Sequence, residues 1–340
     1  MSLKAPVQKL SPAQENPLAR LSNLLAEDMK AVNATILTHM KSDVALIPEL
    51  ASHLIAAGGK RLRPMLTIAT AQMCGYKQGN RAHDLSACVE FIHTATLLHD
   101  DVVDASDTRR GQDSANEVFG NEAAVLVGDF LFSRAFQIMV ADGSLDVLRI
   151  LSNASAVIAE GEVMQLIATQ NLDTSYEKYI DIITSKTAAL FAAACETGAV
   201  VADSKAETSK ALYQYGLNLG IAFQIADDVL DYQSNSDTLG KSIGDDFKEG
   251  KMTLPIIYAI ENATEAEKTF WHDMIVKGQS HDEGFNRAVE LCEKYDVFNR
   301  ALQTAHEFVE RAVQSLDTVP ANEIKSILTD IAHYVVERRF

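Results

Sequence analysis

The sequence predicts an all-α fold, a single large bundle of long antiparallel helices. No proline occurs between Pro64 and Pro255, and a proline inside a helix removes a hydrogen bond and clashes with the preceding turn. Ala, Leu, Glu, Gln, Met and Ile fill most of this stretch, and they are good helix formers. Apolar residues recur at helical spacing in the Leu85–Thr96 and Leu217–Val229 segments, and no run alternates like a strand.

The prolines and turn residues also predict how the chain is divided. Three of the seven prolines lie in the first 17 residues, so we expect residues 1–20 to form a flexible N-terminal arm. Turn residues gather at positions 75–80, 141–144 and 232–246. No linker rich in Pro, Gly or Ser separates the halves of the remaining chain. Residues 21–340 are therefore predicted to be a single all-helical domain.

Composition excludes several classes of protein. The 340 residues are 47% hydrophobic, which is enough to bury a large core. The 47 acidic residues outnumber the 30 Lys and Arg residues and give a net charge of -17, which argues against nucleic acid as a partner. No secretory signal, membrane span or paired-cysteine motif is visible. We expect a cytoplasmic protein with reduced cysteines.

Two acidic clusters carry the strongest functional signal. Each follows an apolar helical segment and has the pattern D-D-x-x-D: Asp100, Asp101 and Asp104 in the first, Asp227, Asp228 and Asp231 in the second. Side chains four residues apart project from the same face of a helix. Like charges placed together at the end of a core-facing segment repel one another unless a cation lies between them. One such cluster alone could equally be a solvated helix end, whereas two in matching contexts favour a cation site.

Hard carboxylate oxygens suit Mg²⁺, Mn²⁺ or Ca²⁺. Mg²⁺ typically binds one or two carboxylates together with water and substrate phosphates. The calcium-loop pattern of an EF-hand is absent. The two clusters therefore favour a metal-bound diphosphate over a closed calcium cage.

Basic segments lie close to the acidic clusters in sequence. They are Gly58–Pro64 (GGKRLRP), Arg109 with Arg110, and Lys241 with Lys251. Arg and Lys bind phosphate oxygens, although each segment alone could be a basic helix start or charge balance for the aspartates. The GKS sequence at 240–242 lacks the first glycine of a P-loop, because position 235 is Asn. His93 and His99 fall on different helix faces and make no zinc pair; a core histidine is the ordinary alternative for His93.

With these segments in place, the sequence resembles the trans-isoprenyl diphosphate synthases, or polyprenyl synthetases. The resemblance is strongest to the long-chain branch, the bacterial octaprenyl and decaprenyl diphosphate synthases. It covers nearly all of the chain after about residue 20, and the family's motifs occur in order: GGKRLRP (58–64), EFIHTATLLHDDVVD (90–104), RRG (109–111), GEVMQL (161–166), SKTA (185–188), FQIADDVLDY (223–232) and GKSIGDDFKEGK (240–251).

The resemblance implies a fold with a deep central cavity and a homodimer. It implies head-to-tail, 1'-4 condensation of isopentenyl diphosphate with an allylic diphosphate, farnesyl or geranyl diphosphate. The cofactor implied is Mg²⁺, two or three ions, with Mn²⁺ as a possible substitute. The products implied are chains of about C40 to C50 for quinone side chains. A shorter-chain synthase and a non-catalytic regulatory subunit of a heteromeric synthase are the alternatives, but the complete aspartate clusters disfavour the subunit.

The resemblance also implies a role for individual residues. The metal ligands are Asp100, Asp104, Asp227 and Asp231. The allylic diphosphate contacts are Arg109, Lys186, Lys241 and Lys251. The isopentenyl diphosphate contacts are Gly59, Lys60, Arg63, His93 and Arg110. Lys186, Thr187 and Gln224 are the catalytic groups that face the forming carbocation.

The resemblance also implies that the length of the prenyl product depends on the residues that precede the first aspartate cluster. In short-chain relatives, bulky aromatics near the fourth and fifth positions before the first aspartate block the cavity. Here these positions are Thr96 and Ala95, and Ile92 is the next side chain down. We expect both small residues to lie on nearly the same helix face as Asp100 and to leave the cavity floor open, so that Ala95→Phe would shorten the product.

Overall fold

The computed structural model describes residues 16–56, 59–77, 79–109, 111–233, 244–279 and 281–337. The first half forms α1 (Pro17–Leu24), α2 (Ala26–His39), α3 (Leu46–Ala56), α4 (Leu62–Met73), α5 (Arg81–Val103), α6 (Ala115–Phe119), α7 (Asn121–Asp142) and α8 (Leu145–Ala168). The second half forms α9 (Tyr176–Ile183), η1 (Thr184–Ala188), α10 (Ala189–Val201), α11 (Ala206–Gln233), α13 (Asp245–Lys248), α14 (Leu254–Glu261), α15 (Glu265–Trp271), η2 (His272–Val276), α16 (Asp282–Lys294), α17 (Val297–Ser315) and α18 (Glu323–Glu337).

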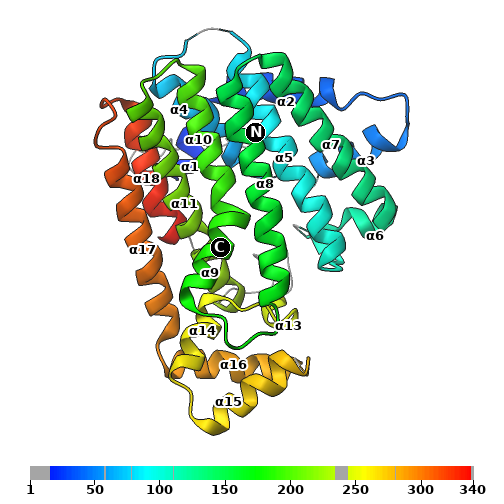
Figure 1. The fold of residues 1–340 in the computed structure, drawn as a ribbon, viewed down its shortest axis with the longest axis vertical. Helices are drawn as coiled ribbons and strands as arrows, with labels where there is room; N and C mark the ends of the chain where they lie inside the picture. Colours follow the sequence, from blue (N-terminus) through cyan, green and yellow to red (C-terminus); the bar gives the residue numbers. More distant parts are fainter. Residues whose placement is uncertain are drawn as a thin grey trace, which may run out of the picture.

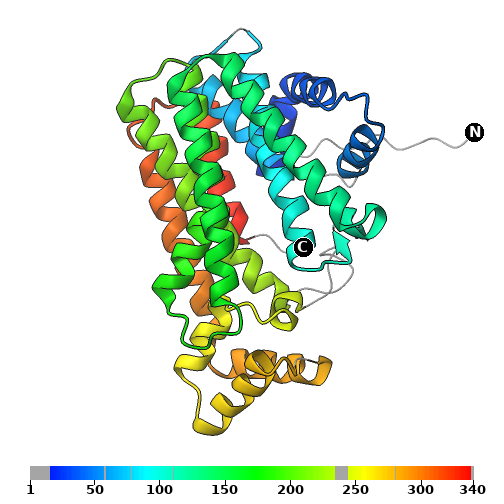
Figure 2. The same ribbon diagram turned by 45° about the vertical axis from the view of Figure 1, so that its right-hand side comes forward.

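The long helices pack side by side along the long axis of the molecule (Figures 1 and 2). α5 lies along α7, α10 packs between α4 and α11, and α11 packs along α17. α15 and α16 form one end of the molecule, beyond α14 (Figure 1). The predicted all-α class is confirmed. One small exception is a two-stranded antiparallel ribbon, β1 (Thr108–Arg109) with β2 (Gln112–Asp113), at the RRG turn.

Local sequence signals explain where several helices begin and end. α7 ends at Gly143, whose φ of 75° is in the left-handed region that glycine adopts without strain. The side chain of Ser144 then accepts a hydrogen bond from the backbone N–H of Val147 and caps α8. Thr264 and Glu267 form a complete capping box at the start of α15. The turn expected at 141–144 is therefore the connection between α7 and α8.

Glycines allow the central helices to approach closely. A Cβ on Gly216 of α11 would lie 2.4 Å from the carbonyl oxygen of Phe191 in α10. A Cβ on Gly198 of α10 would lie 2.5 Å from the carbonyl oxygen of Thr67 in α4. Both separations are too short for a side-chain carbon, so α4, α10 and α11 pack backbone to backbone only because these positions are glycine.

The helical part of the chain starts earlier than the sequence predicted. Residues 17–20, which we had assigned to the N-terminal arm, lie in α1. α1 packs on α18, where Arg20 Nη1 lies 2.7 Å from Asp330 Oδ2 and Asn16 Nδ2 lies 2.6 Å from the Tyr334 hydroxyl. Contacts with a helix at the other end of the chain stabilise this segment, and no local pattern reveals them.

α7 differs from the other long helices in its apolar composition. Among the described residues, it alone is long and apolar enough to cross a membrane by length and composition. Its buried side packs on α5, as expected for a helix of the bundle.

Candidate active site

A cavity of about 710 Å³ lies at the centre of the bundle. It collects most of the side chains that the sequence singled out. The predicted residues that line it are Gly59, Lys60, Arg63, His93, Thr96, Asp100, Asp104, Arg109, Lys186, Thr187, Gln224, Asp227, Asp231 and Lys251. Residues from α4, α5, η1 and α11 therefore converge on one space although they are far apart in the chain. His93, which could have been an ordinary core histidine, belongs to the lining.

Some predicted residues fall outside the described part of the chain. These are Arg110, Lys241 and the first glycine of the GGKRLRP segment, Gly58. Their expected contacts stay predictions.

The residues predicted to set the length of the prenyl product divide into two groups. Thr96 lines the cavity, whereas Ala95 and Ile92 are fully buried and are not among the described lining residues. Five residues of an α-helix turn through about 140° beyond one full revolution. Ala95 therefore does not share a face with Asp100, and our expectation that both small residues do so is wrong for Ala95.

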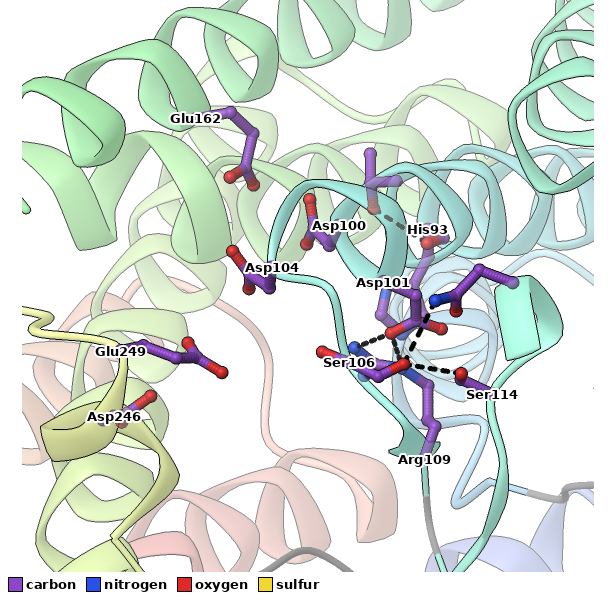
Figure 3. A network of polar contacts seen from close by, with 12 residues as sticks. His93, Asp100, Asp101, Asp104, Ser106, Arg109, Ser114, Glu162, Asp246 and Glu249 are labelled. Atoms are coloured by element: carbon purple, nitrogen blue, oxygen red, sulfur yellow. Dashed lines mark hydrogen bonds and ion pairs between the residues drawn. The ribbon is translucent and has the colours of Figure 1, made fainter. Parts of the chain in front are cut away.

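The two aspartate clusters meet additional carboxylates that sequence reasoning missed. Figure 3 shows Glu162 of α8, Asp246 of α13 and Glu249 directed toward the same space as Asp100 and Asp104. Isolated acidic residues on a helix look the same in sequence as a solvated face, although Glu162 belongs to the GEVMQL segment and Asp246 and Glu249 to the segment that ends at Lys251.

Asp101 points away from this group (Figure 3). It is 1% exposed and forms an ion pair with Arg109. Adjacent helix positions are about 100° apart, so Asp100 and Asp101 face different surroundings. Asp101 thereby holds Arg109, which lies in β1, in the lining of the cavity.

Two lysines lie among the carboxylates. Lys186 Nζ is 2.6 Å from Glu162 Oε2 and 3.7 Å from Asp100 Oδ2. Lys251 Nζ is 2.9 Å from Asp104 Oδ2 and also pairs with Glu249. The two ammonium groups thus connect α5 to α8 and to the segment that follows α13.

The charge of the cluster changes the acidity of its members. Burial raises the pKa of Asp100, and the charge of Lys186 only partly offsets it. Burial, together with the charge of Asp100, raises the pKa of Glu162 to about 7. Burial lowers the pKa of Lys186, but Asp100 and Glu162 outweigh this effect and the net pKa is raised. Because Asp100, Glu162, Asp104 and Glu249 outnumber the two lysines that pair with them, the cavity carries excess negative charge and favours an added cation.

The donor set fits a hard divalent cation. The ligands available are carboxylate oxygens, and Oε1 of Glu162 is buried without a hydrogen-bond partner. Among the described residues, no three acidic, His or Cys side chains are close enough to hold a metal by themselves. Mg²⁺ commonly retains water and phosphate ligands, so an incomplete protein shell is the arrangement expected for a metal that binds together with a diphosphate.

A π-helical turn places Lys186 and Thr187. η1 interrupts the path from α9 to α10, and such turns often occur at functional sites. Gly161 of α8 permits the close approach, because a Cβ there would lie 2.6 Å from the backbone nitrogen of Lys186. Glu162, the next residue of α8, is thereby brought to the Lys186 ammonium.

A chain of buried and partly buried hydrogen bonds lies in the lining of the cavity. The Thr187 hydroxyl donates to Gln224 Oε1 at 2.8 Å, and Gln224 Nε2 donates to Asp228 Oδ1 at 2.7 Å. The Tyr179 hydroxyl donates to Asp228 Oδ2, also at 2.7 Å. Burial and the charge of Asp246 raise the pKa of Asp228 to about 8, while the two donors oppose the rise. Tyr179 was not predicted, because a single tyrosine on α9 carries no local signal.

The basic segment forms a separate part of the lining. Arg61 precedes α4 in a left-handed conformation with a φ of 47°, and its Nη1 lies 2.6 Å from Glu90 Oε1. Arg63 Nη1 lies 3.1 Å from His93 Nε2, and its guanidinium lies 4.3 Å from the centre of the Phe191 ring. The Arg61–Glu90 ion pair holds the turn that brings Lys60 and Arg63 to the cavity.

Comparison with known proteins identifies relatives over nearly the full chain. The octaprenyl diphosphate synthase of Escherichia coli K12 is 44% identical over 323 residues, which cover 94% of this chain and 99% of the relative. The geranyl-diphosphate-specific all-trans-nonaprenyl-diphosphate synthase of Rhodobacter capsulatus is 38% identical, with 92% of this chain and 96% of the relative covered.

Solved structures agree with these relatives. A decaprenyl diphosphate synthase from Rhodobacter capsulatus superposes with a TM-score of 0.90 at 50% identity and covers 94% of this chain and 99% of its own. A polyprenyl synthase from Caulobacter crescentus CB15, complexed with calcium and isoprenyl diphosphate, gives 0.92 at 49% identity, with 95% and 98% covered. The sequence profile of the polyprenyl synthetase family matches residues 44–292. The chain therefore belongs to the polyprenyl synthetase family.

Proposed function

We propose that this chain is a long-chain trans-polyprenyl diphosphate synthase, which is a prenyltransferase. Its helical part acts as one catalytic domain. The observation that carries the proposal is the single cavity in which both aspartate clusters, Lys186, Lys251 and the basic segment meet. A structural cation site would account for the aspartates alone. The relatives at 44% and 38% identity are named as long-chain synthases, which supports this activity over a shorter-chain one.

The two parts of the cavity lining correspond to two substrates. The allylic substrate, farnesyl or geranyl diphosphate, binds with its diphosphate near Lys186, Lys251 and Arg109, next to the carboxylates. Isopentenyl diphosphate binds at the basic segment, where Gly59, Lys60, Arg63 and His93 line the cavity. Arg110 and Lys241 complete the two anion sites in this proposal.

The carboxylates hold the metal. Asp100 on α5, Asp104 directly after α5, and Asp227 and Asp231 on α11 are the proposed ligands of two or three Mg²⁺ ions, which Mn²⁺ can replace. When bound, the metal supplies positive charge that stabilises the diphosphate as it leaves.

The remaining chemistry is carried by the chain itself. Lys186 and Lys251 bind the leaving diphosphate in a partly buried site, where fixed charges act more strongly than in water. The oxygens of Thr187 and Gln224 face the allylic carbocation as dipoles and do not attack it. The apolar walls exclude water, which would otherwise quench the cation. After the isopentenyl double bond attacks C1 of the allylic group, the released pyrophosphate takes the proton.

The cavity also bears on product length, for which we propose about C40 to C50, as in the side chains of quinones. Thr96, a small residue, lines the cavity one helical turn before Asp100. Ala95 and Ile92 pack in the buried layer beyond it. A long product has to open space in that layer, so all three positions remain proposed determinants of length.

We propose that the enzyme is a cytoplasmic homodimer. In this proposal it does not bind nucleic acid and does not span a membrane. The support for the dimer is a set of exposed apolar side chains on α7 and α8: Val125, Leu126, Phe136, Val140, Leu145, Val163, Leu166 and Ile167. α7 and α8 are consecutive antiparallel helices, so these side chains follow their length. A second copy that packs its own α7 and α8 here removes the stripe from water.

Product analysis tests the proposed function directly. Purified protein with Mg²⁺, farnesyl diphosphate and excess isopentenyl diphosphate should yield a dominant C40 to C50 product by chromatography and mass spectrometry. Asp227→Asn should lower turnover by about 100-fold or more, because it removes a proposed ligand of the Mg²⁺ that stabilises the leaving diphosphate in the transition state. Products that stop at C15 to C20 would indicate a short-chain synthase. A folded protein without any elongation would indicate a regulatory subunit.

Thr96→Phe tests the cavity floor. A phenyl ring at this lining position should shorten the product while the diphosphate sites remain intact, and Thr96→Ser should keep its length. We expect Ala95→Phe to act in the same direction, because a long chain has to enter the layer where Ala95 packs. Product length is read by mass spectrometry. A C40 to C50 product from Thr96→Phe would show that the chain grows along another wall.

The crowding of carboxylates predicts a pH-dependent stability. Glu162, Asp100 and Asp228 have raised pKa values, so the folded state binds more protons than the unfolded state until pH exceeds these values. Without metal, the free energy of unfolding should therefore fall as pH rises from about 6 to about 8.5. Mg²⁺ with pyrophosphate should reverse much of this loss, since both bind the folded state. Urea unfolding measures the effect.

Glu162→Gln should flatten part of that pH dependence, because the ionisation near pH 7 is lost. Glu160→Gln, at an exposed position on the same helix, is the matched control and should behave like the wild type. Identical pH profiles for Glu162→Gln and the wild type would contradict the assignment.

The dimer proposal is tested by a charge on the apolar stripe. Leu126, on α7, is 67% exposed, and Leu126→Glu should shift the protein from dimer to monomer in sedimentation velocity because a charge would be buried at the interface. Leu37→Glu is the control, since Leu37 is 56% exposed on α2, outside the stripe. An intact dimer in Leu126→Glu would place the interface elsewhere.

A further inference from the structure

We infer that Tyr179 is a positioning residue for the condensation: through Asp228 it fixes the amide of Gln224, and with it the hydroxyl of Thr187, in the orientation that presents their oxygens to the cavity. The inference rests on the proposed function. It concerns a residue that is not among the proposed diphosphate contacts and that no sequence motif singled out.

The first step is the geometry of the hydrogen bonds. Tyr179, Thr187, Gln224 and Asp228 all line the cavity, and three successive hydrogen bonds of 2.7–2.8 Å connect them. The four residues come from α9, η1 and α11. The chain therefore joins three elements at the wall where the allylic cation is proposed to form.

The second step is the direction of each bond. Both oxygens of Asp228 accept hydrogen bonds, one from the Tyr179 hydroxyl and one from the Gln224 amide. The Gln224 amide consequently presents its nitrogen to Asp228 and its oxygen to Thr187. A half-turn of the amide would set its oxygen against the carboxylate, and two acceptors in a buried site repel each other.

The third step is the role of the tyrosine. Tyr179 is 3% exposed and Asp228 is 4% exposed, so water does not readily replace either partner. Burial raises the pKa of Tyr179 well above 10, and the hydroxyl stays a donor at every working pH. Without this donor, one oxygen of Asp228 is unsatisfied. The carboxyl group can then rotate, and it no longer defines which end of the Gln224 amide faces it.

The consequence for the reaction follows from the remaining lone pairs. The Thr187 oxygen gives its hydrogen to Gln224, and the Gln224 oxygen accepts only this one hydrogen bond from the described residues. Each oxygen keeps electron density that can point at a positive centre. A flipped Gln224 would instead direct N–H groups at the cavity wall and destabilise a carbocation there.

The test compares Tyr179→Phe with a matched buried tyrosine. Tyr215 is fully buried on α11, and its hydroxyl donates to the carbonyl oxygen of Leu328 at 2.8 Å, outside the cavity lining. Both substitutions remove one buried hydrogen bond and should lower stability similarly. Tyr179→Phe should lower kcat by about tenfold with KM for both substrates within about twofold, and Tyr215→Phe should leave kcat unchanged.

A second background separates positioning from a general loss of structure. In Gln224→Leu, the group on which Tyr179 acts is gone, so adding Tyr179→Phe should change kcat by less than about twofold. Full additivity of the two substitutions, or an equal fall of kcat in Tyr215→Phe, would overturn the inference.

A readout independent of turnover keeps the inference distinct from the proposed function. The side-chain amide proton signals of Gln224 are identified in the metal-free protein by their loss in Gln224→Leu. They should shift in Tyr179→Phe and stay in place in Tyr215→Phe. Unchanged signals in Tyr179→Phe would reject the positioning role even if the wild type elongates normally. A wild type that makes no product, with the expected shift present, would reject the proposed function and leave the hydrogen-bond chain intact.

Discussion

Several buried carboxylates repel one another at the centre of the bundle, and the surrounding helices have to hold them together. Asp100, Asp104, Glu162, Asp246 and Glu249 face a common space (Figure 3), and burial makes their mutual repulsion costly. Lys186 and Lys251 offset it in part by pairing with members of the group. Negative charge remains in excess after these ion pairs form, so the cavity favours binding of a divalent cation together with a diphosphate.

Close helix packing is what keeps those charges together. Glycines at 161, 198 and 216 allow backbones to approach to distances that a side chain would prevent. The π-helical turn η1 then rotates Lys186 and Thr187 toward the cavity. Positioning therefore comes from rigid helices anchored in an apolar core, which suits a reaction whose charged groups have to stay in place while a carbocation forms.

Within the same cavity, charged and dipolar groups serve different purposes. The lysines and aspartates are the proposed contacts of the diphosphate and its metal, whereas Thr187 and Gln224 offer neutral oxygens. Asp228 belongs by sequence to the second aspartate cluster, yet both of its oxygens accept hydrogen bonds from Tyr179 and Gln224. Asp101 in the first cluster is likewise turned to Arg109. In each D-D-x-x-D pattern, the middle aspartate therefore supports a neighbouring group of the site.

Local spacing in the sequence is enough to predict several features. The absence of proline and the helical periodicity predicted the all-α class, and the i, i+4 spacing predicted that Asp100 and Asp104 share a helix face, as do Asp227 and Asp231. Which distant residues join them depends on how the helices pack. Glu162 and Asp246 resemble any exposed acidic residue in sequence. Ala95 faces away from the cavity because it lies five residues, more than a full helical turn, before Asp100. Tyr179 acquires its proposed role from a hydrogen bond to Asp228, 49 positions away. Helix packing sets these contacts, and no local pattern encodes the packing of one helix against another.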